Sequence, residues 1–359
     1  MSAAPASPPG PAAGHLPVLD GVRAHSIVLV LATHLLPLNA LWAPANDSLG
    51  YLGMALFFVL SGYLIGGQLS ARVDWQGFVV QRLARIVPLA WLFVAVAAVS
   101  VGFSPTAITT HLLFVANLLP GQLRFPFDAY WSLCVEVQFY ALAALLLVLP
   151  APVTRAAIPL LLLAVTGSRL ASGATLGSAT GTRIDDILAG ATLALWLGTP
   201  GRLRAWLAWR WLPGLAAALL CACCVVGPGL ENPLNYLRPY AAALWLGALI
   251  CQPASPPGRW LAQSRWRYLA RISYALYLVH LPLTATWLGS GQGLEKYLKR
   301  PLLILAAIGL AHLSTFHFEQ RFTDWGHRFQ RRRRERRRLP RAGPAERAPH
   351  SPAQHLPPR

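Results

Sequence analysis

Charged side chains are scarce in this sequence. Only 12% of its 359 residues are Asp, Glu, Lys or Arg, whereas a soluble globular chain carries about 25%. Hydrophobic residues make up 55%, and apolar stretches recur along most of the chain, many of them close to the ~20 residues that a helix needs to cross the hydrocarbon core. The composition excludes an ordinary soluble domain and predicts an all-α, polytopic integral membrane protein.

Cysteine is also rare, and none of it is placed for metal binding. All five cysteines lie in apolar surroundings, without a His or a carboxylate at ligand spacing. This pattern argues against a disulfide framework and against a zinc site. We therefore expect no metal and no bound cofactor.

Acidic residues are few, which leaves a net charge of +18. Much of the excess lies in one segment, Arg331 to Arg338, and the remainder falls in short loops between apolar stretches. Lys and Arg in short loops are typical of the cytoplasmic side of a membrane protein rather than of a face that reads nucleic acid. Nucleic acid is not an expected partner.

The apolar windows and the breaks between them predict ten membrane spans, with both termini in the cytoplasm. The expected spans are residues 17–42, 50–70, 85–103, 130–150, 155–171, 182–198, 211–228, 236–252, 267–289 and 300–320. A shorter apolar piece, His111 to Leu119, is too brief to cross and is expected to be re-entrant or interfacial. In this topology the arginine-bearing loops share the cytoplasmic side, and the loop with Lys296, Lys299 and Arg300 is an exception outside.

Three regions follow from this pattern. Residues 1–15 are expected to be a disordered N-terminus, residues 16–325 a membrane domain, and residues 326–359 an Arg-rich and then Pro-rich cytoplasmic tail. The tail is interpreted as a disordered anchor on anionic lipid, without chemistry of its own.

The first span holds the largest group of ionisable residues. A charge inside a span costs at least ~2.5 to 3.5 kcal/mol on insertion scales, so each one is a functional candidate. At ~100° per residue, Asp20, Arg23 and His34 return to within about 60° of one another on one helical face, and His25 falls opposite. Asp20 and Arg23 also suit a snorkelling interfacial pair, and His34 also suits a structural hydrogen bond between helices.

The next segments carry small and basic residues. In LGMALFFVLSGYLIGG, Ser61 and four glycines permit close approach of another backbone or of a ligand, and helix packing explains them equally well. Arg82 and Arg85 then follow at i, i+3 spacing. Such a pair either clamps a phosphate or satisfies the preference for positive cytoplasmic loops.

Further polar groups lie in later spans. Glu136 stands in the first turns of an otherwise apolar span with Tyr140 on the same face, and its expected partner is His34 or an arginine. In RISYALYLVHLPL, Ser273, Tyr277 and His280 form one polar stripe, which either lines a cavity or bonds a neighbouring helix.

One motif receives a purely structural interpretation. The segment RIDDILAG carries Arg183, Asp185 and Asp186 at the outer mouth of a span. We interpret the three side chains as an interfacial ion pair.

The ordered set of segments resembles acyltransferase family 3, the membrane proteins that O-acylate bacterial surface polysaccharides and related carbohydrates. The resemblance covers roughly residues 16–325 and rests on LDGVRAHSIVLVLATH, FFVLSGYLI, RLARIVP, WSLCVEVQFY, RIDDILAG, ISYALYLVH and FEQRF. The family pattern WSLSVEEQFY is altered here, since Cys134 replaces Ser and Val137 replaces the second Glu. Glu136 is kept.

The resemblance implies a multi-pass protein of the bacterial inner membrane that takes an acyl group from cytoplasmic acyl-CoA, with acetyl-CoA the expected donor. The acceptor would be a carbohydrate at or beyond the membrane. His34 would be the catalytic histidine, Arg23 its companion, and Arg82 and Arg85 the basic motif near the donor.

Acyl transfer from a thioester to an alcohol needs a base, donors for the oxyanion and exclusion of water. We hypothesise that His34 takes the proton, that Glu136 or Asp20 orients or charges its partner, and that Arg23 stabilises negative charge. Ser61, or Ser132, is also a candidate for a covalent acyl relay. Ser61, Tyr277 and His280 complete the candidate substrate-binding residues.

The rival hypothesis is a transporter or flippase of a glycan or a lipid-linked sugar. Buried His, Glu and Arg side chains also serve as proton relays and substrate paths in transporters. Only the ordered family motifs favour the enzyme over the transporter.

Overall fold

The computed structural model describes residues 15–36, 43–175, 177–199, 201–226 and 232–338, and it contains helices and no strand within these ranges. The α-helices are α1 (Pro17–Leu35), α2 (Ala43–Ser70), α3 (Trp75–Val101), α4 (Pro105–Leu112), α5 (Trp131–Val148), α6 (Ala151–Ser172), α7 (Ile184–Leu197), α8 (Leu203–Leu207), α9 (Leu212–Cys224), α10 (Arg238–Cys251), α11 (Pro256–Leu261), α12 (Arg265–Thr284), α13 (Gly293–Leu313) and α14 (Gln320–Arg338). Three-residue helices η2 (Ala116–Leu118) and η3 (Asp128–Tyr130) precede α5, and a π-helix, η7 (Ser314–Glu319), joins α13 to α14.

The all-α, multi-pass prediction is confirmed. Each expected span overlaps a helix, although residues 37–42 of the first expected span and 227–228 of the seventh lie outside the described residues. Six helical segments of the described residues are long and apolar enough to cross a membrane. Helices α7, α9 and α10 have only 13 or 14 residues, so the count of ten stays a prediction. The short piece near residue 111 forms α4 and η2, which are too short to cross, as expected.

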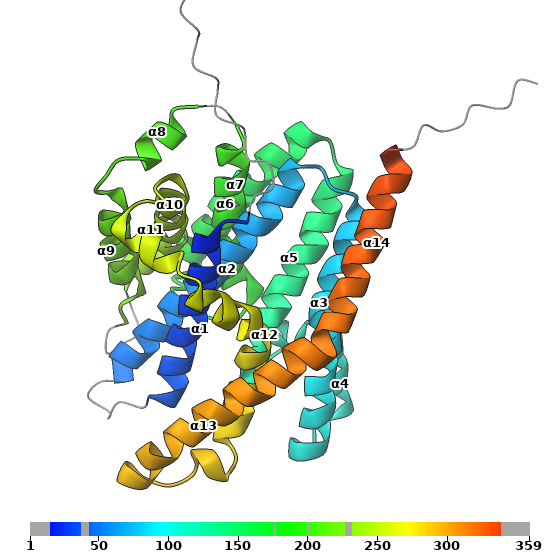
Figure 1. The fold of residues 1–359 in the computed structure, drawn as a ribbon, viewed down its shortest axis with the longest axis vertical. Coiled ribbons are helices and arrows are strands. Elements are labelled where there is room, and N and C mark those ends of the chain that lie inside the picture. The colour runs from blue at the N-terminus through cyan, green and yellow to red at the C-terminus, as the bar shows by residue number, and fades with distance from the viewer. Residues whose placement is uncertain (1–14, 37–42, 176, 200, 227–231, 339–359) are drawn as a thin grey trace, which may run out of the picture.

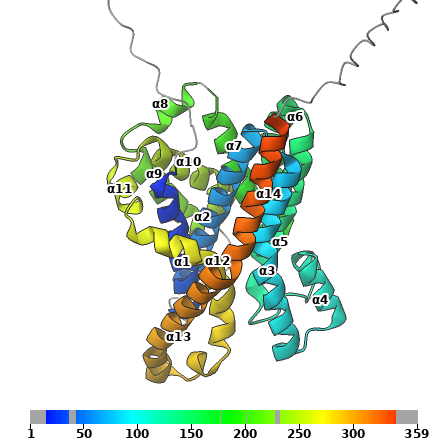
Figure 2. The ribbon, with the colours of Figure 1, turned by 45° about the vertical axis from the view of Figure 1, so that its right-hand side comes forward.

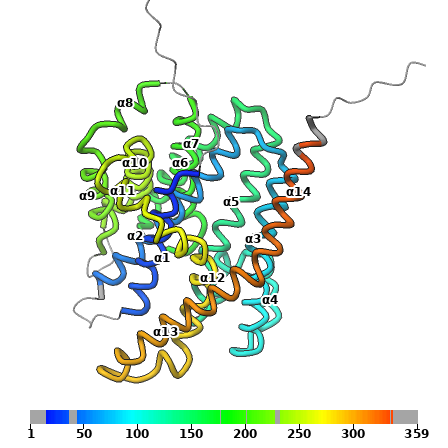
Figure 3. Tube along the Cα trace, viewed as in Figure 1, coloured from blue at the N-terminus to red at the C-terminus, as the bar shows by residue number. Residues whose placement is uncertain are grey.

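The helices divide the molecule into two ends (Figure 1). The α2–α3 and α5–α6 turns, α8 and the last turn of α14 lie at the upper end, and α4 and the α12–α13 connection lie at the lower end; Figure 3 traces the same path. Arg72 links the two upper turns, since its guanidinium donates to the carbonyl oxygens of Leu146 at 3.2 Å and Leu149 at 2.6 Å. These bonds satisfy carbonyls that the C-terminus of α5 leaves open.

The basic segment after the last expected span is helical. Helix α14 continues to Arg338 and lies along α3 (Figure 2). Arg333 Nε donates to Asp74 Oδ2 at 2.7 Å, and Gln81 bonds His327 at 2.8 Å. Residues 326–338 of the expected tail are therefore helical in the structure, and polar contacts with α3 and with Asp74 directly before it extend as far as Arg333. Residues 339–359 and 1–14 lie outside the described residues.

The glycines of α2 serve helix packing. A Cβ built on Gly62 would overlap the carbonyl oxygen of Ile187, and one built on Gly190 of α7 would overlap that of Val59. Gly53 similarly approaches the backbone of α1 at Ser26. Helices α1 and α7 thus lie against α2 at backbone distance, which only small residues permit. The alternative interpretation, approach of a ligand to these glycines, does not apply to Gly62.

We predict opposite effects for two glycine-to-alanine substitutions. Gly190→Ala forces α7 away from α2 and should destabilise the protein by about 1–3 kcal/mol, the usual range for overpacking. Gly309→Ala lies in α13 with open space around the new methyl and should be neutral or stabilising, by up to about 1 kcal/mol from helix propensity. Thermal unfolding of the detergent-purified variants measures both, and equal melting temperatures would contradict the packing argument.

Candidate functional site

His34 lies in a cavity of about 360 Å³, here called the His34 cavity. The last turns of α1 supply His34, the first turns of α2 supply Asp47 and Tyr51, and the start of α5 supplies Trp131. The side chain of His34 is exposed into this space. An accessible imidazole in a polar hollow, with helices around it, is placed for chemistry on a small part of a larger ligand.

The ionisable groups near His34 are another histidine, two aspartates and Arg183. The ring of His280 lies 5.2 Å from that of His34, centroid to centroid. Nδ1 of His280 bonds the carbonyl oxygen of Tyr277 at 2.6 Å, and its buried Nε2 has no partner in the described structure. Asp47 and Asp128 are the carboxylates that line the same cavity, and Oδ1 of Asp128 is unpartnered within the described residues.

Most of the other residues singled out from the sequence meet elsewhere. A small cavity of about 30 Å³, here called the Glu136 pocket, is bordered by Arg23, Ser61, Arg82, Arg85, Glu136 and Ser273, among others. The next cavity, about 280 Å³ and here called the basic mouth, shares Arg23, Arg85 and Tyr274 with it and adds Asp20, Arg271 and Glu319. The two spaces therefore adjoin.

Glu136 has partners that differ from those expected. Its Oε1 accepts hydrogen bonds from Ser61 at 2.8 Å and from Tyr140 at 2.6 Å, and the side chain is buried. The shared face of Glu136 and Tyr140 is confirmed. Neither Glu136 nor Asp20 lines the His34 cavity, so the structure does not bring the two expected carboxylates to His34.

Arg23 and His34 share a helical face, as the spacing predicts, but not a cavity. Eleven residues separate them, which is about 16 Å along α1. Arg23 borders the Glu136 pocket and the basic mouth, where Asp20 also lies with its carboxylate 2.8 Å from His15 Nε2. His25 points the other way and packs between Trp260 and Trp266, each 4.3 Å away between ring centroids.

An aromatic pair separates the His34 cavity from the Glu136 pocket. Tyr277 lines the first and Phe57 lines the second, and their rings are stacked at 6.5 Å with an angle of 5°. The Tyr277 hydroxyl donates to the carbonyl oxygen of Ala129 at 2.9 Å and accepts from Ser132 at 2.8 Å. The polar stripe of α12 therefore borders both spaces, which favours the cavity-lining interpretation over a contact with one neighbouring helix.

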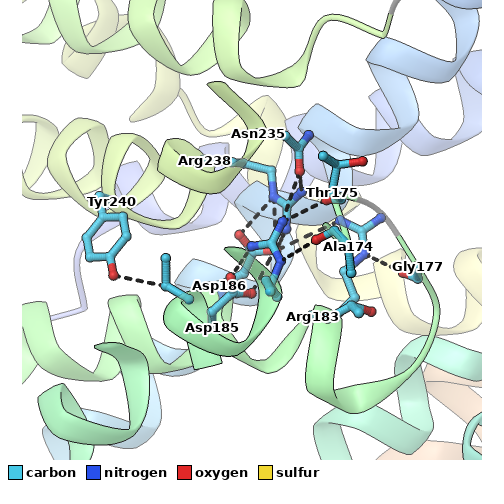
Figure 4. Close-up of polar contacts among 12 residues, drawn as sticks. Ala174, Thr175, Gly177, Arg183, Asp185, Asp186, Asn235, Arg238 and Tyr240 are labelled. Atoms are coloured by element: carbon cyan, nitrogen blue, oxygen red, sulfur yellow. Dashed lines mark hydrogen bonds and ion pairs between the residues drawn. The ribbon is translucent and has the colours of Figure 1, made fainter. Parts of the chain in front are cut away.

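The ion pair expected at RIDDILAG is present between Arg183 and Asp186 at 4.0 Å, but it is buried in the protein rather than exposed. Asp185 and Asp186 are fully buried and belong to a network that joins α6, α7 and α10 (Figure 4). Arg169 pairs with Asp185, while Nε and Nη2 of Arg238 donate to the Asp186 carboxylate at 3.0 to 3.2 Å. The network cannot be recognised in the sequence, because its members lie between Arg169 and Arg238, about 70 residues apart.

Sequence reasoning also missed two groups of the His34 cavity and one of the basic mouth. Asp47 lies in the polar first turns of α2, and Asp128 lies just before α5. Polar residues are ordinary in such segments, so the sequence offers no reason to single these two out. Glu319 belongs to the FEQRF segment, for which the sequence predicts no role. In the π-helix its carboxylate accepts a hydrogen bond from the Ser314 hydroxyl at 2.7 Å. A π-helix often marks a functional site, and that is the signal that could have drawn attention to it.

No three His, Cys, Asp or Glu side chains gather as a metal site within the described parts of the chain. What the arrangement offers is a pair of polar spaces in a multi-pass membrane protein. One holds His34 with two aspartates and Arg183, and the other holds three arginines with three carboxylates. Such a protein can hold an anionic donor at one end and a polar acceptor at the other.

Comparison with known proteins identifies the family of this multi-pass membrane protein. The family described as "Acyltransferase domain" matches residues 16–318, and the chain belongs to it. The predicted family is thereby confirmed. No solved structure matches the chain.

Three relatives illustrate the similarity. YrhL of Bacillus subtilis (strain 168), whose name describes a peptidoglycan O-acetyltransferase, is 30% identical over 75% of this chain and 48% of its own length. BcsY of Komagataeibacter xylinus, whose name describes a membrane-bound transacylase, is 30% identical over 74% and 72%. O-acetyltransferase OatA of Staphylococcus aureus (strain NCTC 8325 / PS 47) is 26% identical over 75% and 50%. The chain thus spans about half the length of YrhL and OatA.

We predict that breaking the buried network destabilises the protein more than removing it. Arg238→Met leaves Asp186 buried without its main partner, and loss of one member of a buried pair costs about 3–5 kcal/mol. The double variant Arg238→Met, Asp186→Leu should recover much of that loss, because no unpaired carboxylate remains. Thermal unfolding in detergent is the readout; a double variant no more stable than Arg238→Met would contradict the account.

Proposed function

We propose that this protein is an O-acyltransferase of the bacterial inner membrane that moves an acyl group, acetyl in the simplest case, from acyl-CoA to a hydroxyl of a surface or exported carbohydrate. Membership of the acyltransferase family and the relatives named for O-acetyl transfer support the reaction class. The observation that carries the proposal is the position of His34, exposed in a polar cavity, while Arg23 at the other end of the same face of α1 lines a separate cavity with Arg85 and Arg271.

His34 suits the role of general base. With an unperturbed pKa near 6.5, histidine exchanges protons near neutral pH. Asp47 and Asp128 line the same cavity, and a carboxylate near the imidazole would stabilise its charged form during the transfer. In the reaction the acceptor oxygen forms a bond to the thioester carbonyl carbon, the carbon–sulfur bond breaks, and the hydroxyl proton passes through His34 to the departing thiolate. His280, whose Nδ1 is bonded to backbone, would keep His34 oriented.

The basic mouth suits the donor. Arg23 and Arg85 border it, and Arg271 lies there with its guanidinium 4.5 Å from the ring centre of Phe316. Arginine binds phosphates through paired, charge-assisted hydrogen bonds. CoA phosphates bound here would leave the thioester arm directed past the Glu136 pocket, where Arg82 also lies, toward the Tyr277–Phe57 pair.

The separation of the Glu136 pocket from the His34 cavity would protect the donor thioester from water. A thioester must be kept from water until an acceptor is present, because hydrolysis would waste it. The stacked rings of Phe57 and Tyr277 separate the donor-side pocket from the His34 cavity in this structure. Displacement of this pair by the acyl arm would bring the thioester to His34.

We predict that His34→Ala abolishes surface acylation whereas His25→Ala retains it. Removing a general base typically lowers the rate by about 10²–10⁴-fold. His25 is the matched control, because it lies on the same helix but packs against Trp260 and Trp266. Mass spectrometry of surface polysaccharides and glycolipids from deletion cells complemented with each variant, at matched membrane abundance, is the measurement.

Each outcome of that experiment has a meaning. An acyl mass that disappears on deletion and returns with wild type and His25→Ala, but not with His34→Ala, supports the transferase and the base. A changed glycan composition with unchanged acylation would instead favour the transporter or flippase. If His34→Ala restores acylation, His34 is not the general base, but the conclusion that the protein is an acyltransferase still stands.

We further predict that Arg85→Gln selectively weakens binding of the nucleotide part of the donor. Loss of one charge-assisted bond to phosphate, about 1.5–3 kcal/mol, should raise KM for acetyl-CoA by about 10- to 150-fold. KM for acetyl-pantetheine, which keeps the thioester but lacks every phosphate, should not change. Arg155→Gln, on the exposed surface of α6, is the control. An equal rise in both KM values would place Arg85 outside the donor site.

A further inference from the structure

Arg183 is a buried cation at the wall of the His34 cavity. Its side chain is 3% exposed, and the residue lines the cavity together with His34. Nε donates to the carbonyl oxygen of Gly177 at 2.8 Å, and the guanidinium carbon lies 4.9 Å from the ring centre of Tyr51 and 5.2 Å from that of Trp131. Backbone and two aromatic rings therefore fix the group in place (Figure 4 labels Arg183 and Gly177).

The buried network does not neutralise this charge. Arg169 pairs with Asp185, and Arg238 holds both oxygens of Asp186. Arg183 Nη1 approaches Asp186 Oδ2 only to 4.0 Å and has no hydrogen-bond partner in the described structure. Three guanidinium groups thus face two carboxylates, and the surplus positive charge falls on the member that borders the cavity.

The cavity carboxylates do not compensate Arg183 either. Asp47 and Asp128 line the same space, yet within the described residues neither forms an ion pair with Arg183. A buried cation whose counter-ion lies 4.0 Å away and whose Nη1 has no hydrogen-bond partner is poorly compensated, so a ligand that brings an anion to Nη1 would bind favourably there. The carboxylates, as hydrogen-bond acceptors only, are suited to hydroxyl groups of the same ligand.

We propose that the acceptor is an anionic saccharide whose carboxylate or phosphate pairs with Arg183 while the neighbouring hydroxyl reaches His34. This inference rests on the proposed transfer reaction and adds the substrate class. Arg183 would then determine specificity, because an acceptor without the anion leaves Nη1 of the guanidinium buried without a hydrogen-bond partner. The aromatic rings of Tyr51 and Trp131 would still hold a neutral sugar, but more weakly.

The test uses the full chain, purified in detergent, and the glycan that the mass spectrometry identifies. Repeat-unit oligosaccharides from deletion cells, which lack the acyl group, are compared in native form and after their carboxylates are reduced to alcohols or their phosphates removed. Separate treatment distinguishes the two anions. We expect neutralisation to lower kcat/KM for the wild type by about tenfold or more, the value of one charge-assisted bond.

The variants assign the effect to Arg183. In Arg183→Gln the native oligosaccharide should already have the reduced kcat/KM and neutralisation should change nothing further, while Arg155→Gln should behave as the wild type. Without donor, ligand-observed NMR should show glucuronate binding to the wild type more tightly than glucose, and Arg183→Gln should lose that difference.

Several results would overturn the inference. It fails if the acylated repeat unit bears no anionic group, or if the wild type uses native and neutralised oligosaccharides equally, a comparison that needs no variant to fold. It also fails if Arg183→Gln lowers kcat/KM equally for both forms, since Arg183 would then act on the reaction rather than on the acceptor charge. Absence of any acylated glycan in the cell experiment would instead refute the transfer reaction.

Discussion

The buried ion network between α6, α7 and α10 is the constraint on which the rest of the structure depends. Asp185 and Asp186 are taken wholly out of solvent at the first turn of α7, and Arg169 and Arg238 must reach them from two other helices to make that burial tolerable. Asn235 joins both arginines through its side-chain oxygen. The observed placement of the three helices satisfies all of these groups.

This placement determines the geometry of the cavity. Helix α7 is held by the network on one side and lies backbone against backbone with α2 on the other, at Gly62 and Gly190. The start of α7 therefore cannot move without breaking one of the two contacts. Arg183 lies directly before α7 and is therefore also held in place. Its guanidinium lines the same cavity as His34. Preorganised charge of this kind is more effective than charge on a mobile side chain.

Much of the fold was predictable, because hydrophobic length and the distribution of arginine report membrane helices directly. Local features of the site were predictable for a similar reason: Glu136 with Tyr140, and Arg23 with His34, share faces that helical periodicity dictates. The partners of His34 and of Asp185 were not predictable. Periodicity relates residues within one helix, whereas these contacts depend on how helices distant in sequence are packed.

The same limit explains why arginines that look alike in the sequence differ in the structure. Arg72 bonds backbone carbonyls at a turn, Arg238 is neutralised by Asp186, and Arg183 is buried without its own carboxylate. Arg238 and Arg183 are the same residue type and are both buried, so these two properties alone would assign a structural role to each. Only the balance of charges within the folded network separates them, because a compensated arginine stabilises the packing of helices, whereas an uncompensated one beside a cavity favours a ligand of opposite charge.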